Sequence, residues 1–525
     1  MPKVLISDRM SPKAAEIFRS RGIEVDEKPG LSKEELKAII GFYDGLAIRS
    51  STKVTADLLA AADRLKVVGR AGIGVDNVDV PAASARGVVV MNTPFGNSIT
   101  TAEHAIALMF ALARQLPEAD ASTQAGKWEK NRFMGVELTG KTLGLIGCGN
   151  IGGIVADRAH GLKMKVIAHD PFLTPERAQD LGVEKVTLDE LLARADFISL
   201  HTPLTESTRN ILSRANLLKT KRGVRIINCA RGGLIDEAAL KELLDSGHIA
   251  GAALDVFAEE PATSSPLFGT PGFISTPHLG ASTEEAQVNV AIQVAEQMAD
   301  FLLSGAVQNA LNMPSVSAED APRLRPYMSL AEKLGALAGQ LEGAEIRSIT
   351  VEAEGAAAEL NIKPITAAAV AGVMRQFSDT VNMVNAPFIA RDRNIEIAEV
   401  RHERDTDYQT LLRVTLRTPE GERAVAGTLF AGTTPRLVEI GGIKVEADFA
   451  PRMLYIVNED KPGFIGRLGT LLGDAGVNIG TFHLGRRAAG GEAVLLLSVD
   501  QPIAEPLMWE LCRLPGVRRV KALGF

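Results

Sequence analysis

The sequence contains little cysteine and no surplus of positive charge. Three cysteines in 525 residues, Cys148, Cys229 and Cys512, are too few for a disulfide framework and indicate a reducing compartment. None of them lies in a Cys-x-x-Cys or histidine-rich cluster of the kind that holds zinc, so we expect no metal site. The net charge of −7 and the pI near 5.8 disfavour nucleic-acid binding, which usually shows as clustered basic residues.

Long apolar runs are also missing. The run from Ala105 to Ala113 is too short to cross a bilayer, and no other stretch reaches about 18 uninterrupted apolar residues. Met1-Pro2-Lys3 leads directly into the apolar run Val4-Leu5-Ile6, which leaves no room for a secretory signal. We therefore expect a cytoplasmic protein without a membrane segment, whose partners are small molecules.

What is present is the composition of an ordinary soluble protein. Apolar residues make up 46% of the chain and charged residues 23%, which is neither a disordered nor a fibrous composition. Because domains usually contain about 100–200 residues, a chain of 525 residues should form three or four of them.

Short β-branched segments alternate with helical patterns in two successive series. This alternation is typical of βαβ units and predicts parallel sheets in two α/β domains, with an active site in the cleft between them. The six strands of the second series are enough for a complete doubly wound domain. The first series predicts strands at 3–7, 47–49, 67–68 and 88–91, with helices at 12–21 and 101–114. The second predicts strands at 142–146, 166–168, 197–200, 225–228, 252–254 and 273–275.

The remaining chain carries no motif with evident chemistry. A helical stretch at 283–304 leads into segment 309–322, which is rich in Asn, Pro, Ser and acidic residues and is predicted to be a linker. Helical and alternating patterns follow, and the last segment, 452–525, indicates a small βαβ ligand-sensing module. The individual patterns are a helix at 327–341, an Ala-rich stretch at 351–374, and alternating segments at 411–416 and 442–449.

A dinucleotide fingerprint opens the second series. Gly147-x-Gly149-x-x-Gly152 follows an apolar strand, begins a helix, and is followed by a second strand that ends at Asp170. The glycines allow a tight turn, close approach of the pyrophosphate and close helix packing, and the helix N-terminus favours negative charge. Asp170 should bond the ribose hydroxyls and repel a 2′-phosphate, which favours NAD. The alternative is that the glycines form only a turn and that Asp170 is an exposed turn residue.

Three side chains after later strands offer the chemistry of hydride transfer. His278 is the natural acid/base, Glu260 would orient its ring and raise its pKa, and Arg231 would grip a carboxylate bidentately. Each residue alone could be structural, since a histidine after a strand or an arginine before two glycines often is. Their shared place at strand ends, where open α/β sheets bind ligands, strengthens the catalytic interpretation.

These motifs together resemble a known family. Segments 147–152, 228–236, 255–261 and 277–283 are similar, in that order, to the signatures of the D-2-hydroxyacid dehydrogenases. The resemblance implies that Arg231, Glu260 and His278 are the catalytic residues. It also implies a Rossmann NAD-binding domain inserted in a flavodoxin-like substrate domain. Cofactor contacts are implied, besides the glycines and Asp170, at Asn150, Ile151, Thr202, Cys229, Ala230, Arg231, His278 and Gly280, and at Asp255, whose implied role is to hold the nicotinamide carboxamide.

The first domain carries a finer resemblance. Ile48-Arg49-Ser50 and Gly69 to Asp79 look like the substrate loops of the phosphoglycerate-oxidising members. Arg49 and Arg70 are the candidates for the substrate phosphate, together with Lys130 or Arg132 of a neighbouring subunit, since arginine's planar fork suits phosphate. Surface ion pairs are the alternative role for these arginines. The implied substrate-binding residues are Arg49, Ser50, Arg70, Gly72, Ile73 and Gly74, although many relatives have Thr where this chain has Ile73.

The C-terminal segment resembles an ACT domain, a βαββαβ module that binds amino acids at subunit interfaces. The likeness rests on residues 458–466 and 476–479, and it implies that L-serine binds at Asn458, Asp460 and Asn478. These three residues could instead be turn formers in a module that only dimerises. The implied domains are 1–98 with 284–312 for the substrate, 99–283 for NAD, an α+β intervening domain at 316–450 with an allosteric role, and an α+β ACT domain at 451–525.

The resemblance as a whole implies oxidation of 3-phospho-D-glycerate by NAD to 3-phosphohydroxypyruvate, the first step of L-serine biosynthesis. It further implies feedback by L-serine and a homotetramer. Two alternatives stay open from the residues. One is another D-2-hydroxyacid dehydrogenase, such as a glyoxylate, hydroxypyruvate or D-lactate reductase. The other is a non-catalytic NADH-sensing protein of the corepressor type.

Overall fold

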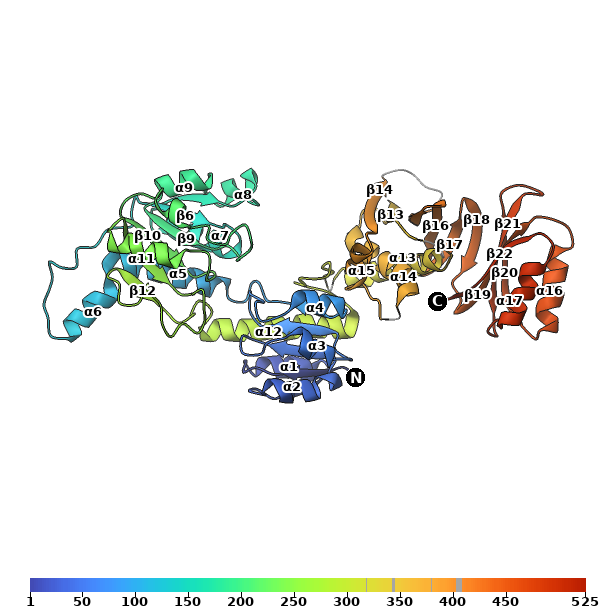
Figure 1. The fold of residues 1–525 in the computed structure, drawn as a ribbon, viewed down its shortest axis with the longest axis horizontal. Coiled ribbons are helices and arrows are strands. Elements are labelled where there is room, and N and C mark those ends of the chain that lie inside the picture. The colour runs from blue at the N-terminus through green and yellow to red at the C-terminus, as the bar shows by residue number, and fades with distance from the viewer. Residues whose placement is uncertain (318, 342–344, 379, 403–407) are drawn as a thin grey trace. The chain divides into compact units, whose positions relative to one another are not determined.

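The computed structural model describes residues 1–317, 319–341, 345–378, 380–402 and 408–525 (Figure 1). These residues form two compact units. One contains residues Thr93–Gln293, and the other contains Met1–Asn92 together with Val294–Phe525. The chain therefore passes from one unit to the other twice, as expected for a domain inserted in another.

The N-terminal sheet has five strands in the order β2-β1-β3-β4-β5, all parallel, which is the flavodoxin arrangement. Its central strands are buried and mostly apolar, as strands covered on both faces must be. The charged edge strand β2 was not predicted, because its sequence Glu-Val-Asp-Glu gives no apolar signal. The elements are β1 (Lys3–Ile6), α1 (Lys13–Ser20), β2 (Glu24–Glu27), α2 (Lys33–Ile39), β3 (Gly45–Ile48), α3 (Ala56–Ala60), β4 (Val67–Arg70), α4 (Val80–Ala85) and β5 (Val89–Met91).

The sheet of the second unit has seven parallel strands in the order β12-β11-β10-β9-β6-β7-β8. The chain direction across the sheet reverses between β6 and β9, which makes a topological switch point at their carboxyl ends. The short exposed strand β8 was not predicted. The elements are α5 (Ser98–Arg114), α6 (Leu116–Gln124), β6 (Thr142–Ile146), α7 (Asn150–Gly161), β7 (Lys165–His169), α8 (Pro175–Asp180), β8 (Glu184–Lys185), α9 (Leu188–Arg194), β9 (Phe197–Leu200), α10 (Arg214–Leu217), β10 (Val224–Asn228), α11 (Glu237–Asp245), β11 (Ile249–Leu254) and β12 (Phe273–Ser275).

The next part of the chain is α+β. After α12, the predicted linker 309–322 forms isolated bridges through Ala310 and Val316, and its end is already helical. The Ala-rich segment 351–374 contains the end of one strand and then a helix. Helices α13 and α14 pack closely (Figure 1), since a Cβ at Gly335 would meet the Ala369 carbonyl oxygen at 2.0 Å. The elements are α12 (Glu284–Ser304), α13 (Ala321–Leu341), β13 (Ser348–Gly355), α14 (Ile362–Met374), α15 (Ala386–Asp392), β14 (Glu396–His402), β15 (Thr410–Thr418), β16 (Gly421–Phe430), β17 (Thr434–Ile440) and β18 (Ile443–Asp448), with sheet order β14-β13-β15-β16-β17-β18.

The C-terminal sheet has four antiparallel strands in the order β20-β21-β19-β22. Its element order along the chain is βαββαβ, the order expected of the predicted ACT module, and helices α16 and α17 share its apolar core. The elements are β19 (Arg452–Glu459), α16 (Phe464–Asp474), β20 (Ile479–Arg486), β21 (Glu492–Val499), α17 (Glu505–Arg513) and β22 (Val517–Gly524).

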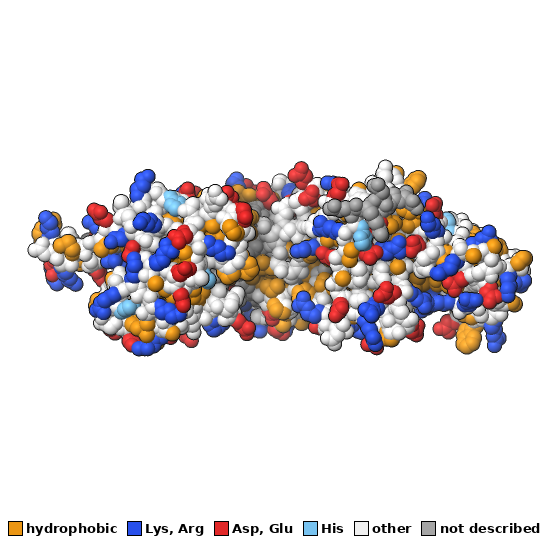
Figure 2. Space-filling model, turned by 90° about the horizontal axis from the view of Figure 1, so that it is seen from above, with side chains coloured by type: hydrophobic (Ala, Val, Ile, Leu, Met, Phe, Trp, Pro, Cys, Tyr) orange, Lys and Arg blue, Asp and Glu red, His pale blue; other side chains and the backbone are white. Residues whose placement is uncertain are grey.

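The predicted fold class is therefore confirmed: two parallel α/β sheets come first, and two α+β sheets follow. Among the described residues, no helix is both long enough and apolar enough to cross a membrane. On the face drawn in Figure 2, Lys and Arg side chains are interspersed with Asp and Glu side chains.

Candidate active site

Three neighbouring strands of the second unit end at one level. Asn228 at the end of β10 pairs with Leu254 of β11, and Leu254 pairs with Ser275 of β12. Each strand is followed by a loop that carries a predicted catalytic residue. The parallel register therefore brings these loops to one edge of the sheet, at the carboxyl ends where such sheets bind ligands.

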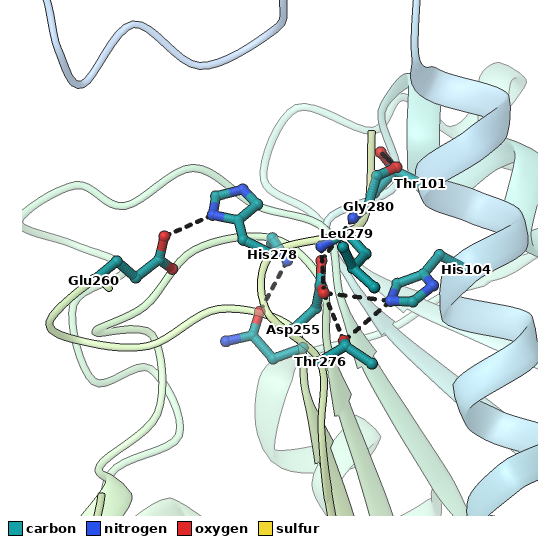
Figure 3. A network of polar contacts seen from close by, with 10 residues as sticks. Thr101, His104, Asp255, Glu260, Thr276, His278, Leu279 and Gly280 are labelled. Atoms are coloured by element: carbon teal, nitrogen blue, oxygen red, sulfur yellow. Dashed lines mark hydrogen bonds and ion pairs between the residues drawn. The ribbon is translucent and has the colours of Figure 1, made fainter. Parts of the chain in front are cut away.

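His278 and Glu260 form the ion pair that was expected from the sequence (Figure 3). The distance from His278 Nδ1 to Glu260 Oε2 is 2.6 Å, and Glu260 Oε1 accepts a hydrogen bond from the backbone N–H of Phe257 at 3.0 Å. The backbone of His278 is left-handed, with φ of 57°, a conformation that non-glycine residues seldom adopt. Because Nδ1 is engaged by Glu260, Nε2 is the ring nitrogen left to exchange a proton with a substrate.

The pair has the electrostatics of an acid/base. The hydrogen bond and charge of Glu260 raise the pKa of His278, against burial and the positive charge of Arg231, which act to lower it. For Glu260, burial acts to raise the pKa, but the His278 and Phe257 hydrogen bonds outweigh it and hold the pKa below its usual value. The carboxylate thus stays ionised and stabilises an imidazolium.

Arg231 stands on a loop that lies directly against the Glu260 loop. A Cβ at Gly232 would lie 1.8 Å from the carbonyl oxygen of Phe257, so only glycine permits this approach. Asn228 holds the loop at both ends: its side-chain oxygen accepts from Ala230 N–H at 3.0 Å, and its side-chain nitrogen donates to the Arg231 carbonyl at 2.8 Å. These two hydrogen bonds fix the backbone of Arg231 and thereby the point from which its side chain extends.

Asp255 is the centre of a second network in the same place (Figure 3). Its side chain is fully buried, and its carboxylate accepts hydrogen bonds from Leu279 N–H at 2.7 Å, Gly280 N–H at 2.8 Å and the Thr276 hydroxyl at 2.5 Å. His104 Nε2, on α5, lies 3.3 Å from Asp255 Oδ1. Burial acts to raise the pKa of Asp255, but the hydrogen bonds from His104, Thr276 and the two N–H groups hold it below its usual value.

Sequence reasoning missed His104 and gave Asp255 a different role. The sequence marks both Thr101 and His104 as polar residues three positions apart on one face of an apolar helix, which was the available signal. Thr101 donates to the Gly280 carbonyl at 2.8 Å, so this face of α5 contacts the loop that carries His278. The predicted contact of Asp255 with a nicotinamide carboxamide stays a prediction: within the protein, Thr276, Leu279 and His104 approach Oδ1 and Gly280 N–H donates to Oδ2.

The glycine-rich turn has the geometry that a dinucleotide requires. Gly147 has φ of 92°, and a Cβ there would meet the His201 carbonyl oxygen at 2.4 Å, whereas a Cβ at Gly152 would meet the Gly147 carbonyl oxygen at 2.4 Å. Gly149 instead faces open space and caps helix α7. The helix N-terminus and the bare backbone at Gly149 therefore fit a pyrophosphate.

The other expected cofactor residues surround the same turn. Asn150 and Ile151 begin α7, and Thr202 follows β9 across the switch point. Asp170 follows β7, and its carboxylate accepts from the backbone N–H groups of Cys148 and Phe172, each at 2.8 Å. Cys229, Ala230 and Gly280 lie in the strand-end loops described above, and burial raises the pKa of the Cys229 thiol, so that it stays protonated and inert.

The predicted phosphate-binding arginines lie at neighbouring strand ends of the other unit. Ile48, the last residue of β3, pairs with Arg70, the last residue of β4, and Arg49 follows directly. Arg49 N–H donates to Asp8 Oδ2 at 2.7 Å, and the Arg49 Nε is buried without a hydrogen-bond partner among the described residues. Burial lowers the pKa of Arg49, although its guanidinium remains a cation.

The loop after Arg70 is shaped around the Arg70 side chain. Gly72 has φ of 147°, and a Cβ there would lie 1.6 Å from an Arg70 guanidinium nitrogen. Ile73 accepts a hydrogen bond at its carbonyl from the Asn92 side chain at 2.6 Å. Ser50 follows Arg49, and Gly74 follows Ile73, so the remaining predicted substrate residues belong to the same two loops.

The three predicted effector residues are not brought together. Asn458 is buried near the end of β19, and Asp460 two residues later is paired with Arg486 at 2.7 Å. Asn478 donates to Asp500 at 2.7 Å, beyond the opposite end of the same sheet. A ligand that contacts all three would need Asn478 from a different copy of the chain.

Comparison with known proteins decides the family. The family model for the NAD-binding domain of the D-isomer specific 2-hydroxyacid dehydrogenases matches residues 106–280, and that of the D-3-phosphoglycerate dehydrogenase intervening domain matches residues 323–441. The D-3-phosphoglycerate dehydrogenase of Synechocystis is 44% identical over 99% of this chain and 94% of its own. The chain belongs to the D-isomer specific 2-hydroxyacid dehydrogenases. A second D-3-phosphoglycerate dehydrogenase, of Bacillus subtilis, is 41% identical over 100% of this chain and 99% of its own.

Two solved structures align with the first part of the assignment, the α/β portion of the chain. A glyoxylate reductase of Paecilomyes thermophila aligns with a TM-score of 0.55 and 32% identity over 59% of this chain and 98% of its own. The TT0316 protein of Thermus thermophilus aligns with a TM-score of 0.54 and 36% identity over 59% of this chain and 99% of its own. The predicted family, the NAD-dependent dehydrogenase class and the intervening domain are thus confirmed.

Proposed function

We propose that the chain oxidises 3-phospho-D-glycerate with NAD to 3-phosphohydroxypyruvate, the first step of L-serine biosynthesis. The observation that carries this proposal is the likeness to D-3-phosphoglycerate dehydrogenases, at 44% and 41% identity, over essentially the whole chain. Simple reductases such as the glyoxylate reductase align with only 59% of it. The intact His278–Glu260 pair supports a catalyst rather than a protein that only senses NADH.

His278 is the proposed base. Its Nδ1 is held by Glu260, so its Nε2 takes the proton of the C2 hydroxyl as hydride leaves C2. The imidazolium that forms is stabilised by the ionised Glu260 carboxylate at 2.6 Å. NAD, when bound, supplies the hydride acceptor.

Arg231 is the proposed anchor of the substrate. A planar guanidinium can donate two parallel hydrogen bonds to a carboxylate, and it also stabilises negative charge on the forming carbonyl oxygen. The cofactor is proposed to bind at the Gly147–Gly152 turn, at residues 150 and 151 of α7, at Thr202, and at Asp170 through the ribose hydroxyls. Cys229, Ala230 and Gly280 complete the proposed cofactor set.

Arg49 and Arg70 are the proposed phosphate ligands. They end adjacent strands, so that both cations start from one edge of the N-terminal sheet. Ser50, Gly72, Ile73 and Gly74 would contribute through the same loops, and Lys130 or Arg132 would come from a neighbouring subunit. Two part-buried cations that start from adjacent strand ends favour a phosphorylated substrate over a simple hydroxyacid.

A substrate panel tests the assignment. Initial rates of NADH formation would be measured with 3-phospho-D-glycerate, D-glycerate and D-lactate, with the oxo acid product trapped. The proposal predicts a kcat/KM for the phosphorylated acid at least about 100-fold above the other two, because a phosphate bound by two arginines contributes several charge-assisted hydrogen bonds. Preference for an unphosphorylated acid would contradict it. In Arg70→Ala this preference should shrink, while turnover of D-lactate should change little.

Regulation by L-serine is a separate proposal. It is supported by the βαββαβ order of the C-terminal sheet and by Asn458, Asp460 and Asn478, which offer groups for an ammonium and a carboxylate. Since Asn478 lies at the far end of the sheet, the effector would bind between two copies, which fits a homotetramer. Millimolar serine should suppress turnover, and sedimentation analysis should show four chains per particle.

We also propose that the protein acts in the cytoplasm. All three cysteines are free thiols, as a reducing compartment would keep them. Fluorescence microscopy of a tagged full chain in its own host would test this, and an exported product would contradict it.

A further inference from the structure

His104 lies in the first half of α5 and turns its ring toward the candidate active site (Figure 3). Its Nε2 is 3.3 Å from Asp255 Oδ1 and 3.2 Å from the Thr276 hydroxyl oxygen. The Thr276 hydroxyl donates to Asp255 Oδ1, which leaves its oxygen free to accept. Nε2 of His104 therefore carries a proton and is a donor to this pair of oxygens.

Asp255 in turn holds almost the entire loop that carries His278. Its carboxylate accepts from the hydroxyl of Thr276 and from the N–H groups of Leu279 and Gly280. Its backbone carbonyl accepts from the N–H of His278 at 3.0 Å. Apart from Pro277, every residue from 276 to 280 thus donates one hydrogen bond to Asp255.

This attachment matters because the loop is strained. His278 adopts a left-handed backbone, and such a conformation persists only when its surroundings enforce it. If the Asp255 carboxylate turned away, its hydrogen bonds to Thr276, Leu279 and Gly280 on either side of His278 would be lost together. The His278 imidazole would then no longer meet Glu260 in one fixed geometry.

The fully buried carboxylate also explains why a donor is needed from α5. A buried carboxylate without enough hydrogen bonds is strongly disfavoured, and among the described residues His104 supplies the one side-chain donor that comes from outside the loop and its strand. His104, Cys229 and Asp255 are close enough to suggest a metal site. However, Asp255 already accepts three hydrogen bonds of 2.8 Å or less, and Cys229 is a buried thiol, so an ion would have to displace these partners.

We propose that His104 is a positioning residue for the reaction: its Nε2–H fixes the Asp255–Thr276 pair, and through Asp255 it holds His278 in register with Glu260. The proposal rests on the function proposed above for His278. It assigns to His104 a part in the chemical step although the side chain need not touch the substrate.

Two variants separate this role from simple packing. His104→Leu keeps a side chain of similar size but removes the donor, whereas His104→Gln can place an amide N–H where Nε2 stood. A matched control is His160→Leu on α7, which removes a part-buried histidine that bonds the Leu181 carbonyl at 3.1 Å, away from the strand-end loops. Thermal unfolding of all three would measure any general loss of stability.

The first readout is steady-state kinetics, in which the kcat of NADH formation from 3-phospho-D-glycerate and the KM for NAD are measured separately. His104→Leu should lower kcat by about 10- to 100-fold, the loss that a small misplacement of a catalytic group causes. His104→Gln should restore most of it, and His160→Leu should stay near the wild-type kcat. A kcat for His104→Leu equal to that of the wild type, or no recovery with Gln, would overturn the proposal.

The second readout needs no turnover. The pKa of His278 can be followed by NMR in the protein without cofactor, with its signal assigned by its loss in His278→Ala. Glu260, Asp255 and Arg231 face this imidazole, and Glu260 raises its pKa in the wild type. His104→Leu should move this pKa down toward the ordinary value, and Gln should move it back. An unchanged pKa of His278 in His104→Leu would overturn the positioning role. A wild type that is inactive on 3-phospho-D-glycerate would instead overturn the proposed function alone, and the pKa measurement would still test His104.

Discussion

The strand-end loops of the second unit and the C-terminal sheet both carry three predicted ligand or catalytic residues, yet one set converges and the other does not. In the second unit, Arg231, Glu260 and His278 follow adjacent parallel strands, so their loops share one edge. In the C-terminal sheet, Asn478 directly precedes β20, at the end of the sheet opposite to Asn458. The parallel register places three successive loops at one edge of its sheet, whereas Asn458 and Asn478 lie at opposite ends of the antiparallel sheet.

The largest expected effect is on kcat and comes from the strand-end loops of the second unit. His278→Ala removes the proposed base, and kcat should fall by about 10²- to 10⁴-fold, the usual contribution of a positioned acid or base. Steady-state rates at saturating 3-phospho-D-glycerate and NAD would show it. Binding of NADH, followed by fluorescence, should persist. A variant with near-wild-type kcat would exclude His278 from the chemistry.

A backbone change tests whether the loops really need to touch. In Gly232→Ala the new Cβ would lie 1.8 Å from the Phe257 carbonyl, so the Arg231 loop must move from the Glu260 loop. We expect kcat/KM to fall by about 100-fold. Gly161→Ala is the matched control, because its Cβ meets no atom within 4 Å. Equal kinetics of the two variants would mean that the contact has no catalytic importance.

The pH dependence tests the electrostatics of the same edge. Glu260 raises the pKa of His278, so oxidation, which needs the neutral imidazole, rises with pH through that raised pKa. In Glu260→Gln the pKa should fall, so the acid limb of the log kcat/KM profile should move to lower pH, and kcat should drop about tenfold. Aspartate in place of Glu260 keeps the charge and serves as the comparison. An acid limb that does not move would assign it to another group.

Cofactor choice should respond more modestly. Asp170 is held by Cys148 and Phe172 N–H groups beside the glycine turn, where its charge would meet a 2′-phosphate. Asp170→Ser should reduce kcat/KM for NAD by about tenfold and raise that for NADP, which corresponds to about 1.4 kcal/mol in each case. Parallel assays with the two cofactors measure the ratio of kcat/KM for NAD to that for NADP. An unaltered ratio would mean that Asp170 does not contact the adenosine ribose.

The smallest expected effect concerns the C-terminal sheet. In Asn478→Ala the ratio of rates with and without millimolar serine should approach one, because one proposed effector ligand is gone. Asn216→Ala, which removes an asparagine of the unit formed by Thr93–Gln293, is the comparison. Serine inhibition that survives in Asn478→Ala would show that Asn478 does not bind the effector.

The sequence alone pointed to most residues of the candidate active site because its signals are local. The glycine fingerprint with Asp170, and the residues 228–236, 255–261 and 277–283, each lie within one loop beside one strand. The charged strand β2 and the two-residue strand β8 escaped because an exposed edge strand needs no apolar pattern. The Ala-rich stretch 351–374 gave no element boundary, because its buried strand end and its buried helix look alike in composition.

What the sequence could not predict depends on contacts between distant segments. His104 and Asp255 are separated by 151 positions, and only the packing of α5 against the strand ends brings them to 3.3 Å. The contact at Gly232 with Phe257 and the left-handed backbone of His278 are likewise properties of the folded loops. Residue types gave the chemistry, and the tertiary arrangement decided which groups are coupled.

The most direct test of the central claim is isotopic. 3-Phospho-D-glycerate deuterated at C2 would be incubated with the protein, NAD and a trap for the oxo acid, and the reduced cofactor would be analysed by mass spectrometry. If His278 acts as base while hydride leaves C2, the NADH must carry one deuterium, and its formation must stop in His278→Ala. Unlabelled NADH, or labelled NADH formed equally fast by His278→Ala, would contradict the mechanism.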